Sequence, residues 1–278
     1  MPSNKKTKIV ATLGPSTSSK EVLRKMLKEG VNVFRINFSH ASYDDVIERM
    51  KMIRDLNKEE GYNAAILGDL QGPKLRVGRM KEEVVVSEGD EIVFATGKEF
   101  KGTSKRVFMN YNSFPKDVEA GELILLDDGK LIFEVLSTNK KDEVKTKVIQ
   151  GGPLRSKKGV NLPNTKISLP ALTKKDIKDT IFACEQGVDW IALSFVRHAE
   201  DLVELQKLIE ENSKYKIPII AKIEKPEGVA NIDKIVAYCD GLMVARGDLG
   251  VEIPAQEVPL IQKKLVLTAK KARIPVII

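Results

Sequence analysis

Residues 31–70 read VNVFRINFSHASYDDVIERMKMIRDLNKEEGYNAAILGDL, and the alternation within them decides the fold. The run Val31–Phe38 predicts a strand, Tyr43–Glu60 predicts a helix, and Ala64–Leu70 predicts another strand. A strand, a helix and a strand in succession are typical of a parallel sheet with helices packed outside it. The stretch therefore predicts an α/β fold.

The same alternation extends to both sides of this stretch. Upstream, Lys8–Leu13 predicts a buried strand that Gly14-Pro15 stops, and a helix follows from Ser18 or Ser19 to Glu29. Downstream we expect helices over Lys174–Gln186 (capped by Thr173), Ala199–Glu211, Pro226–Tyr238 and Gln256–Ala272, and strands over Val188–Phe195, Pro218–Glu224, Gly241–Ala245 and Pro275–Ile278. The seven strands predict a (β/α)8-type TIM barrel that is incomplete by one strand and two helices; a sheet that stays open is the alternative.

The alternation is interrupted between Gln71 and Pro163, where no amphipathic helix is evident. Short β-rich runs lie there instead, at Glu83–Ser87, Glu91–Thr96, Arg106–Asn110, Leu123–Leu126, Lys130–Leu136 and Glu143–Val148. Turn residues separate them, at Glu88-Gly89-Asp90, Asp127-Asp128-Gly129 and Gly151-Gly152-Pro153. We predict an all-β lid domain over residues 71–163, inserted after the third strand of a barrel domain made of residues 1–70 and 164–278. The hinges are expected at Leu70–Pro73 and Pro163–Asn164.

Composition narrows the class of protein. The 278 residues are 42% hydrophobic and 31% charged, which is ordinary for a soluble globular protein, and neither a membrane span nor a signal peptide is evident. We therefore expect a cytoplasmic protein without a membrane partner. The net charge of +7 is spread along the chain and aromatic residues make up only 5%, which favours anionic small molecules over nucleic acid. Cys184 and Cys239 are expected to be buried, reduced and structural.

The chemistry of a barrel lies at the carboxyl ends of its strands. Lys222 and Glu224 share one face of the fifth strand, and Asp248 follows the sixth strand. Two carboxylates at neighbouring strand ends could share Mg²⁺, and Lys222 could neutralise a transferring phosphoryl group or an enolate. A purely structural network of one lysine and two carboxylates explains the same spacing equally well.

The second and third strands favour the functional interpretation. Arg35, Asn37 and Ser39 alternate with apolar residues toward one strand end, and Asp69 lies at the end of the next strand. Asn37, Ser39 and Asp69 would offer oxygen ligands to a cation or an ammonium group. Arg35 and Arg76 supply guanidinium groups for phosphate oxygens. His40 could equally cap the following helix, and His198 is assigned no role.

Five runs resemble the signatures of pyruvate kinase, in that family's order: Thr7–Pro15 (TKIVATLGP), Arg35–His40 (RINFSH), Lys157–Pro163 (KKGVNLP), Ile219–Val229 (IIAKIEKPEGV) and Met243–Pro254 (MVARGDLGVEIP). The resemblance covers essentially the whole chain, including the inserted β domain. It implies Mg²⁺-dependent (or Mn²⁺-dependent) phosphoryl transfer from phosphoenolpyruvate to ADP, giving pyruvate and ATP. It also implies that the parent protein is a homotetramer.

The resemblance also implies roles for individual residues. Glu224 and Asp248 match the family's magnesium ligands. Lys222 matches the lysine that binds substrate and stabilises the phosphoryl transition state and the enolate, and Arg35 matches the arginine that contacts the phosphoryl group. The remaining matches are Ala245, Arg246, Gly247 and Asp248 for the substrate carboxylate, and Arg76, His40, Lys158 and Asn37 for the nucleotide.

Two features depart from the family's pattern. Members that need a monovalent cation typically carry Thr-Lys-Gly-Pro-Glu where this chain has Leu70-Gln71-Gly72-Pro73-Lys74. We therefore expect Lys74 to supply an ammonium in the region of Asn37, Ser39, Asp69 and Leu70, so that K⁺ is not required. The chain also stops before the family's last barrel elements and C-terminal domain, and we expect the 278 residues alone to be inactive and prone to aggregate.

Two other classes of function are considered. A magnesium-dependent barrel aldolase or lyase acting on pyruvate or phosphoenolpyruvate would share the Glu/Asp site but would lack the lid and the Arg35–His40 run. A basic binding module would show salt-sensitive polyanion binding and no magnesium requirement. ADP dependence separates the first alternative from a kinase.

Overall fold

The computed structural model describes residues 6–39 and 41–278, which form two compact units. The barrel unit comprises the described residues up to Gly72 together with 171–245 and 262–278. The lid unit comprises residues 73–170 and 246–261. The chain thus returns to the barrel unit between Pro170 and Ala171, whereas the sequence-based boundary falls at Pro163.

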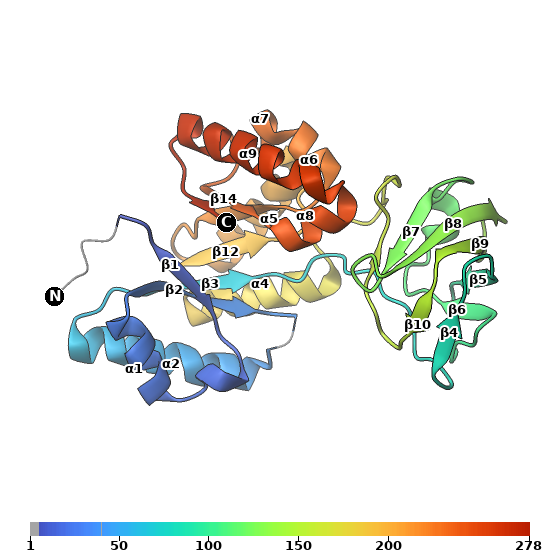
Figure 1. The fold of residues 1–278 in the computed structure, drawn as a ribbon. Helices are drawn as coiled ribbons and strands as arrows, with labels where there is room; N and C mark the ends of the chain where they lie inside the picture. Colours follow the sequence, from blue (N-terminus) through green and yellow to red (C-terminus); the bar gives the residue numbers. More distant parts are fainter. Residues whose placement is uncertain (1–5, 40) are drawn as a thin grey trace. The chain divides into compact units, whose positions relative to one another are not determined.

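The barrel unit is built on a seven-stranded parallel sheet in the order β1-β2-β3-β12-β13-β14-β15 (Figure 1). Its strands are β1 (Ile9–Thr12), β2 (Val31–Asn37), β3 (Ala65–Asp69), β12 (Trp190–Leu193), β13 (Ile219–Ile223), β14 (Gly241–Val244) and β15 (Val276–Ile277). The sheet curves into a nearly closed barrel with β1 and β15 as its outer strands. The predicted α/β barrel of about seven strands is confirmed.

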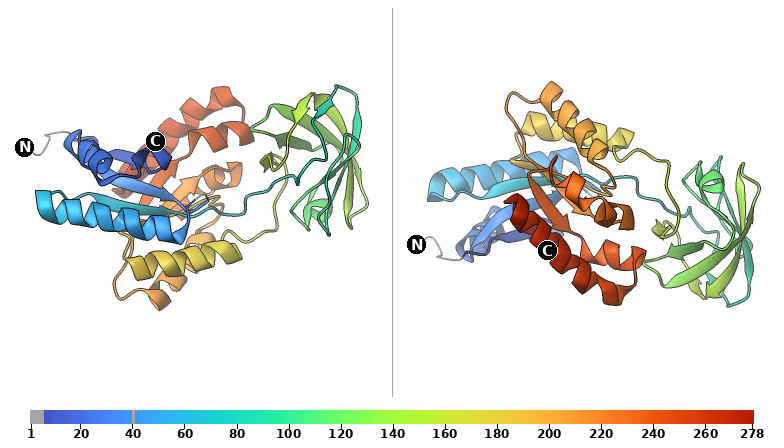
Figure 2. Two further views of the ribbon diagram at one scale, coloured as in Figure 1. Left: turned by 90° about the horizontal axis from the view of Figure 1, so that it is seen from below. Right: turned by 90° about the horizontal axis from the view of Figure 1, so that it is seen from above.

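Helices surround these strands when the unit is viewed from below and from above (Figure 2). They are α1 (Lys20–Lys28), α2 (Tyr43–Glu60), α4 (Lys174–Gln186), α5 (Ala199–Asn212), α6 (Pro226–Ala230), α7 (Ile232–Ile235) and most of α9 (Val258–Ala272). Ser19 and Thr173 cap α1 and α4 through side chains that accept backbone N–H groups, as predicted. No helix in the described part of the chain is long and apolar enough to span a bilayer.

Two helix predictions need correction. The expected helix over Pro226–Tyr238 is two short helices that divide at Asn231, whose φ of −95° and ψ of 10° are not helical. The expected helix over Gln256–Ala272 begins at Val258, after a single 3-10 turn (Ala255–Glu257). Helix α8 (Arg246–Glu252), preceding that turn, was not predicted.

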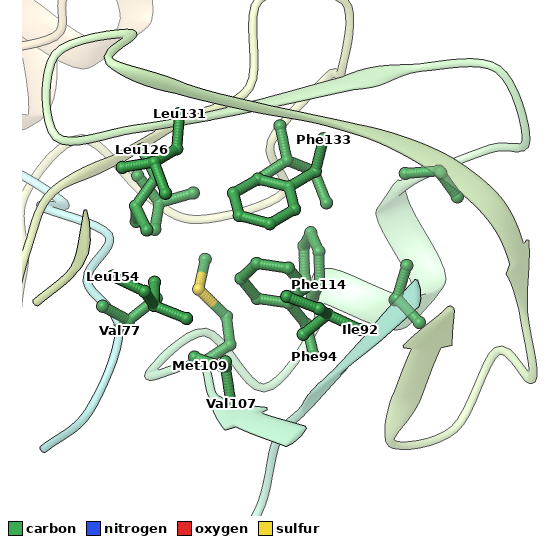
Figure 3. Packing of buried hydrophobic residues seen from close by; sticks show 14 of the residues in the cluster. Val77, Ile92, Phe94, Val107, Met109, Phe114, Leu126, Leu131, Phe133 and Leu154 are labelled. Atoms are coloured by element: carbon green, nitrogen blue, oxygen red, sulfur yellow. The ribbon is translucent and has the colours of Figure 1, made fainter. Parts of the chain in front are cut away.

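The lid unit holds a six-stranded sheet in the order β11-β7-β8-β9-β5-β6 and a two-stranded sheet of β10 and β4. Its strands are β4 (Val84–Val86), β5 (Glu91–Ala95), β6 (Arg106–Phe108), β7 (Leu123–Leu126), β8 (Leu131–Thr138), β9 (Glu143–Gln150), β10 (Gly152–Leu154) and β11 (Val160–Asn161). A short helix, α3 (Phe114–Asp117), supplies Phe114 to the core, where Phe94 lies edge-on to both Phe114 and Phe133 (Figure 3). The expected β-rich lid is therefore present.

The predicted turn at Gly151-Gly152-Pro153 is wrong in part, because Gly152 and Pro153 belong to β10 and pair with Val86 and Val85. Gly151 precedes this strand at a place where no side chain fits. A Cβ there would lie 2.3 Å from the Val86 carbonyl oxygen, so the glycine marks close backbone approach rather than a turn.

Candidate active site

The inward-facing residues of the barrel change from apolar to polar along five parallel strands. The apolar layer contains Val10, Val33, Leu67, Ala192 and Ile220, which pack together. Two residues further along the same strands lie Thr12, Arg35, Asp69, Ser194 and Lys222. Because successive inward positions on a strand are two residues apart, the polar side chains gather at the carboxyl end of the barrel.

Asp69 is the shared counter-ion of two cations in this polar layer. It is 1% exposed, and its Oδ2 accepts a hydrogen bond from Arg35 Nε at 2.6 Å. Its Oδ1 lies 3.1 Å from Lys222 Nζ. Arg35 is also held by Thr12, whose Oγ1 accepts from Arg35 Nη1 at 2.8 Å. A buried carboxylate with two cationic partners is compensated for its desolvation, and it fixes both cations in place.

Lys222 is the centre of the cluster. Its Nζ donates to Ser194 Oγ at 2.6 Å and lies 3.0 Å from Glu224 Oε1. Burial by itself lowers the pKa of Lys222, but the charges of Glu224 and Asp69 outweigh it and hold the pKa above its ordinary value. Lys222 is therefore a protonated, preorganised cation at neutral pH, suited to stabilising a negative charge that develops on a bound substrate.

Glu224 is oriented by backbone as well as by Lys222. It is 2% exposed, and its Oε2 accepts the N–H of Phe195 at 2.9 Å. Phe195 has a φ of +57°, which places a non-glycine residue in the left-handed region. Such a conformation costs about 1–3 kcal/mol and persists where surrounding contacts over-determine it. The bond that it makes here directs the Glu224 carboxylate.

The segment after β2 carries Asn37 and Ser39. Asn37 pairs in register with Asp69, and its Oδ1 accepts the Ser39 N–H at 3.0 Å. Lys175, on α4, donates to the Phe38 carbonyl oxygen at 2.8 Å and to Asp179 Oδ2 at 2.5 Å, which anchors this segment. Sequence reasoning missed Lys175, although its i,i+4 spacing from Asp179 on a predicted helix was an available signal.

Ser194 is a second residue that sequence reasoning missed. Besides accepting from Lys222, its Oγ donates to the Leu70 carbonyl oxygen at 2.7 Å. Asn37, Ser39, Asp69 and Leu70, predicted to form a monovalent-cation region, lie at the carboxyl ends of β2 and β3 or just beyond them, where Asn37 pairs with Asp69. The Asp69 carboxylate pairs with protein cations there, and the Leu70 oxygen accepts from Ser194. His40 lies outside the described residues.

Arg76 and Lys158, both predicted to approach the nucleotide, lie on adjoining segments of the lid unit. Arg76 Nη1 donates to the Lys157 carbonyl oxygen at 2.9 Å, and Arg76 pairs with Gly159 in an antiparallel bridge. Lys158 Nζ lies 2.9 Å from Asp127 Oδ1, and its hydrogen bond holds the pKa of Asp127 below its ordinary value. Lys74 is half-buried in the same unit.

The predicted substrate-carboxylate segment crosses the unit boundary. Ala245 ends the barrel unit, and Arg246, Gly247 and Asp248 form the exposed first turn of α8 in the lid unit. In the described residues, no group of three or more His, Cys, Asp or Glu side chains is arranged to hold a metal ion.

Cys184 and Cys239 are both free and buried, as expected. Burial raises the pKa of each thiol to about 11, so both remain protonated at neutral pH. Neither cysteine has the thiolate character that nucleophilic or metal-binding chemistry needs.

The barrel carries an Arg–Asp–Lys–Glu cluster at the carboxyl ends of its parallel strands. Barrel enzymes carry their active sites at this end, so the fold and the cluster place the protein in the class of parallel α/β barrels with a charged site at that position. Residues 4–278 match the family described as pyruvate kinase, barrel domain. The chain therefore belongs to the pyruvate kinase barrel-domain family, as the five sequence runs indicated.

Individual pyruvate kinases are similar along nearly the whole chain. The protein of Geobacillus stearothermophilus is 46% identical over 275 residues, covering 98% of this chain and 47% of the relative. That of Corynebacterium efficiens is 45% identical, covering 99% and 57%. Pyruvate kinase 2 of Synechocystis is 44% identical, covering 99% and 47%. The chain thus spans about half the length of the relatives it matches.

Proposed function

We propose that the protein transfers the phosphoryl group of phosphoenolpyruvate to ADP, giving pyruvate and ATP. The observation that supports this most directly is the position of Lys222, a buried ammonium held between Asp69 and Glu224 with Arg35 on the far side of Asp69. Two fixed cations, on β2 and β13, at the carboxyl end of the barrel suit a substrate that carries both a phosphate and a carboxylate. Family membership supplies the reaction.

In this proposal the protein works by positioning and electrostatics. Arg35 contacts the phosphoryl group, and Lys222 stabilises the negative charge of the transferring group and of the enolate. The bond between phosphorus and the enol oxygen breaks as a β-phosphate oxygen of ADP bonds to phosphorus. The electron pair stays on the enolate, which takes a proton at carbon to become pyruvate. Substrate carboxylate binding is assigned to the segment Ala245–Asp248.

Mg²⁺, or Mn²⁺ in its place, is the cofactor in this proposal, and Glu224 and Asp248 would hold it. Bound there, the ion would neutralise phosphoryl oxygens. Glu224 is suited to the task because its two oxygens are already directed by Lys222 and the Phe195 amide. Arg76, Lys158, Asn37 and His40 are assigned to the nucleotide.

The same proposal includes independence from K⁺. Lys74 is to supply the positive charge that a monovalent cation provides elsewhere in the family. The sequence supports this, because members that need a monovalent cation typically carry glutamate where this chain has Lys74. We further propose, from the resemblance, a cytoplasmic homotetramer that binds neither nucleic acid nor membrane; light scattering of the purified protein tests the tetramer.

The direct test is pyruvate formation by the full-length protein with phosphoenolpyruvate, ADP and Mg²⁺, once with K⁺ and once with tetramethylammonium as the only monovalent cation. Equal rates in both salts are expected. A rate that depends on K⁺ would overturn the assignment of Lys74 and leave the reaction standing. Pyruvate release without ADP would indicate a lyase, and no pyruvate at all would overturn the proposed reaction.

A further inference from the structure

The chain leaves the barrel unit after Gly72 (the first connection) and returns to it at Ala171 (the second connection). One buried side chain accepts hydrogen bonds from the backbone next to both connections. Asp176, on the first turn of α4, is 0% exposed. Its Oδ1 accepts the N–H of Gly72 at 3.0 Å. Its Oδ2 accepts the N–H of Thr173 at 2.9 Å and the Thr173 hydroxyl at 2.5 Å. The carboxylate that caps α4 thus also holds the last residue before the lid.

Gly72 lies against the residues that orient the polar cluster. Its φ is +69°, and a Cβ there would lie 2.7 Å from the Phe195 ring and 3.1 Å from Ser194 Cβ. Ser194 bonds both Lys222 and the Leu70 carbonyl, and the Phe195 amide bonds Glu224. The first connection to the lid is therefore packed directly on the groups that position Lys222 and Glu224.

In the lid unit, acidic side chains likewise accept hydrogen bonds from the residues that precede the second connection. The N–H of Ser168 donates to Asp117 Oδ2 at 2.8 Å, and the hydroxyl of Thr165 donates to Glu122 Oε2 at 2.6 Å. Asp117 in the lid unit and Asp176 in the barrel unit therefore fix the two ends of residues 168–173. These contacts anchor both ends of one passage of the chain between the units; the chain also crosses at residues 245–246 and 261–262.

We propose that Asp176 is a positioning residue that clamps two of the connections between the units, the one after Gly72 and the one before Ala171, and joins them to Lys222 and Glu224. The inference rests on the proposed function, since it makes lid movement part of phosphoryl transfer. An ionised aspartate accepts on both oxygens, which the two connections require. Asparagine has the same size but one acceptor oxygen, so it can hold one connection only.

Hydrogen exchange followed by mass spectrometry tests the clamp without substrate. In Asp176→Asn, amides of residues 70–75 and 171–176 are expected to exchange at least tenfold faster, because the amide group cannot accept from both connections. Asp179→Asn is the matched control, being the same change at a buried carboxylate on the same helix that bonds Tyr43 and Lys175 instead. Faster exchange at neither connection, or equal acceleration in both variants, would overturn the clamp.

Kinetics test the coupling to catalysis. Asp176→Asn is expected to lower kcat about tenfold and raise the KM for ADP severalfold, while the KM for phosphoenolpyruvate changes less than twofold. Unchanged kcat and KM with loosened connections would overturn the coupling. If the unsubstituted protein makes no pyruvate while both connections loosen in Asp176→Asn, the proposed function fails and the clamp stands.

A second variant keeps the test decisive if Asp176→Asn does not fold. Gly72→Ala places a methyl group against Phe195 and should accelerate exchange at residues 70–75 and lower kcat. Gly61→Ala is its matched control, because Gly61 has a similar φ of +73° in the same unit but nothing within 4 Å of the added carbon. Equal kcat in the two alanine variants would contradict the proposal.

Discussion

The interiors of the two units differ in the kinds of side chain that they bury. The lid core is apolar and aromatic, with Phe94, Phe114 and Phe133 all 0% exposed and packed edge to face. The barrel interior has a thin apolar layer beneath a layer of charges centred on Asp69 and Lys222. Apolar burial stabilises a fold directly, whereas a buried ion pair contributes little net stability. The difference teaches that the barrel interior holds a preorganised cluster of charges, whereas the lid interior is built for stability.

The largest expected effect is on lid stability. Phe133→Ala removes a ring that contacts Phe94 with centroids 5.2 Å apart, and should lower the free energy of unfolding of the lid by about 3–5 kcal/mol. Hydrogen exchange resolved by unit measures it, and exchange in the barrel strands should not change. Leu136→Ala on the same strand, 40% exposed, is the control and should cost less than about 1 kcal/mol. Equal losses in both units would break the comparison.

The next effect lies in the charged layer. Asp69→Asn removes the shared counter-ion of the half-buried Arg35 and the buried Lys222, leaving each cation with one fewer partner. We expect kcat/KM to fall about a hundredfold, which corresponds to about 2.7 kcal/mol, and barrel stability to fall by about 2–3 kcal/mol. Steady-state kinetics and urea unfolding measure the two losses.

Glu59→Gln is the control for this substitution, because the Lys20–Glu59 pair of the same unit is exposed on the surface. It should leave kcat/KM unchanged and cost no more than about 1 kcal/mol of stability. If Asp69→Asn behaves like Glu59→Gln, the charged layer is not what organises the barrel interior.

Lys74 tests the comparison between the two units from the other side. It lies in the lid unit, yet the proposal assigns it a role in the chemistry. Lys74→Glu restores the residue that potassium-dependent members typically carry there. The variant should be about tenfold slower without K⁺ and should recover with K⁺, since the carboxylate needs a mobile cation. Rates at matched ionic strength in KCl and tetramethylammonium chloride measure this; equal rates in both salts would remove the role assigned to Lys74.

The smallest effect depends on pH. Lys158 lowers the pKa of Asp127 in the folded state, so the pair stabilises the lid above the ordinary pKa of about 3.9, and this contribution disappears as the pH falls through the lowered value. Asp127→Asn should therefore cost up to about 1 kcal/mol at pH 7, and this cost should shrink as the pH falls through the lowered pKa of Asp127.

Asp128→Asn is its matched control, at an exposed position of the same turn with a φ of +59° against +53° for Asp127. Asparagine tolerates both conformations. Unfolding free energies measured from pH 2 to 7 should separate the two variants most clearly above about pH 4, and the difference should shrink as the pH falls through the lowered pKa of Asp127. Parallel curves across the whole range would contradict the ion pair.

Much of the secondary structure and part of the site could be predicted from the sequence, because hydrophobic periodicity and helix capping depend on residues that are close together in the chain. Helices α2 and α4 begin and end at the predicted residues, and the two-residue strand period correctly placed Lys222 and Glu224 on one face. What could not be predicted depends on contacts between distant segments. Ser194 bonds a lysine 28 residues away, and Asp176 bonds an amide 104 residues away.

The same limit applies to assigned roles. Lys158 was matched to the nucleotide, and no local pattern indicated its ion pair with Asp127. Strand β10 was interpreted as a turn because glycine and proline are typical of turns. Gly151 is instead required because the carbonyl group of Val86, on another strand, lies too close to allow a side chain. A sequence pattern indicates the local backbone conformation of one segment. The Lys158–Asp127 ion pair and the close approach of Gly151 to Val86 each depend on two segments that are distant in the sequence, so no local pattern predicts them.

The central claim is that Lys222, held by Asp69, Ser194 and Glu224, stabilises the transferring phosphoryl group. The measurement that tests it most directly is kcat for pyruvate formation from phosphoenolpyruvate and ADP by the full-length protein and by its Lys222→Gln variant, which keeps a donor but no charge. The account predicts a loss of at least about a thousandfold, on the order of 4 kcal/mol, with the variant still folded by circular dichroism. A folded variant that loses less than tenfold would contradict it.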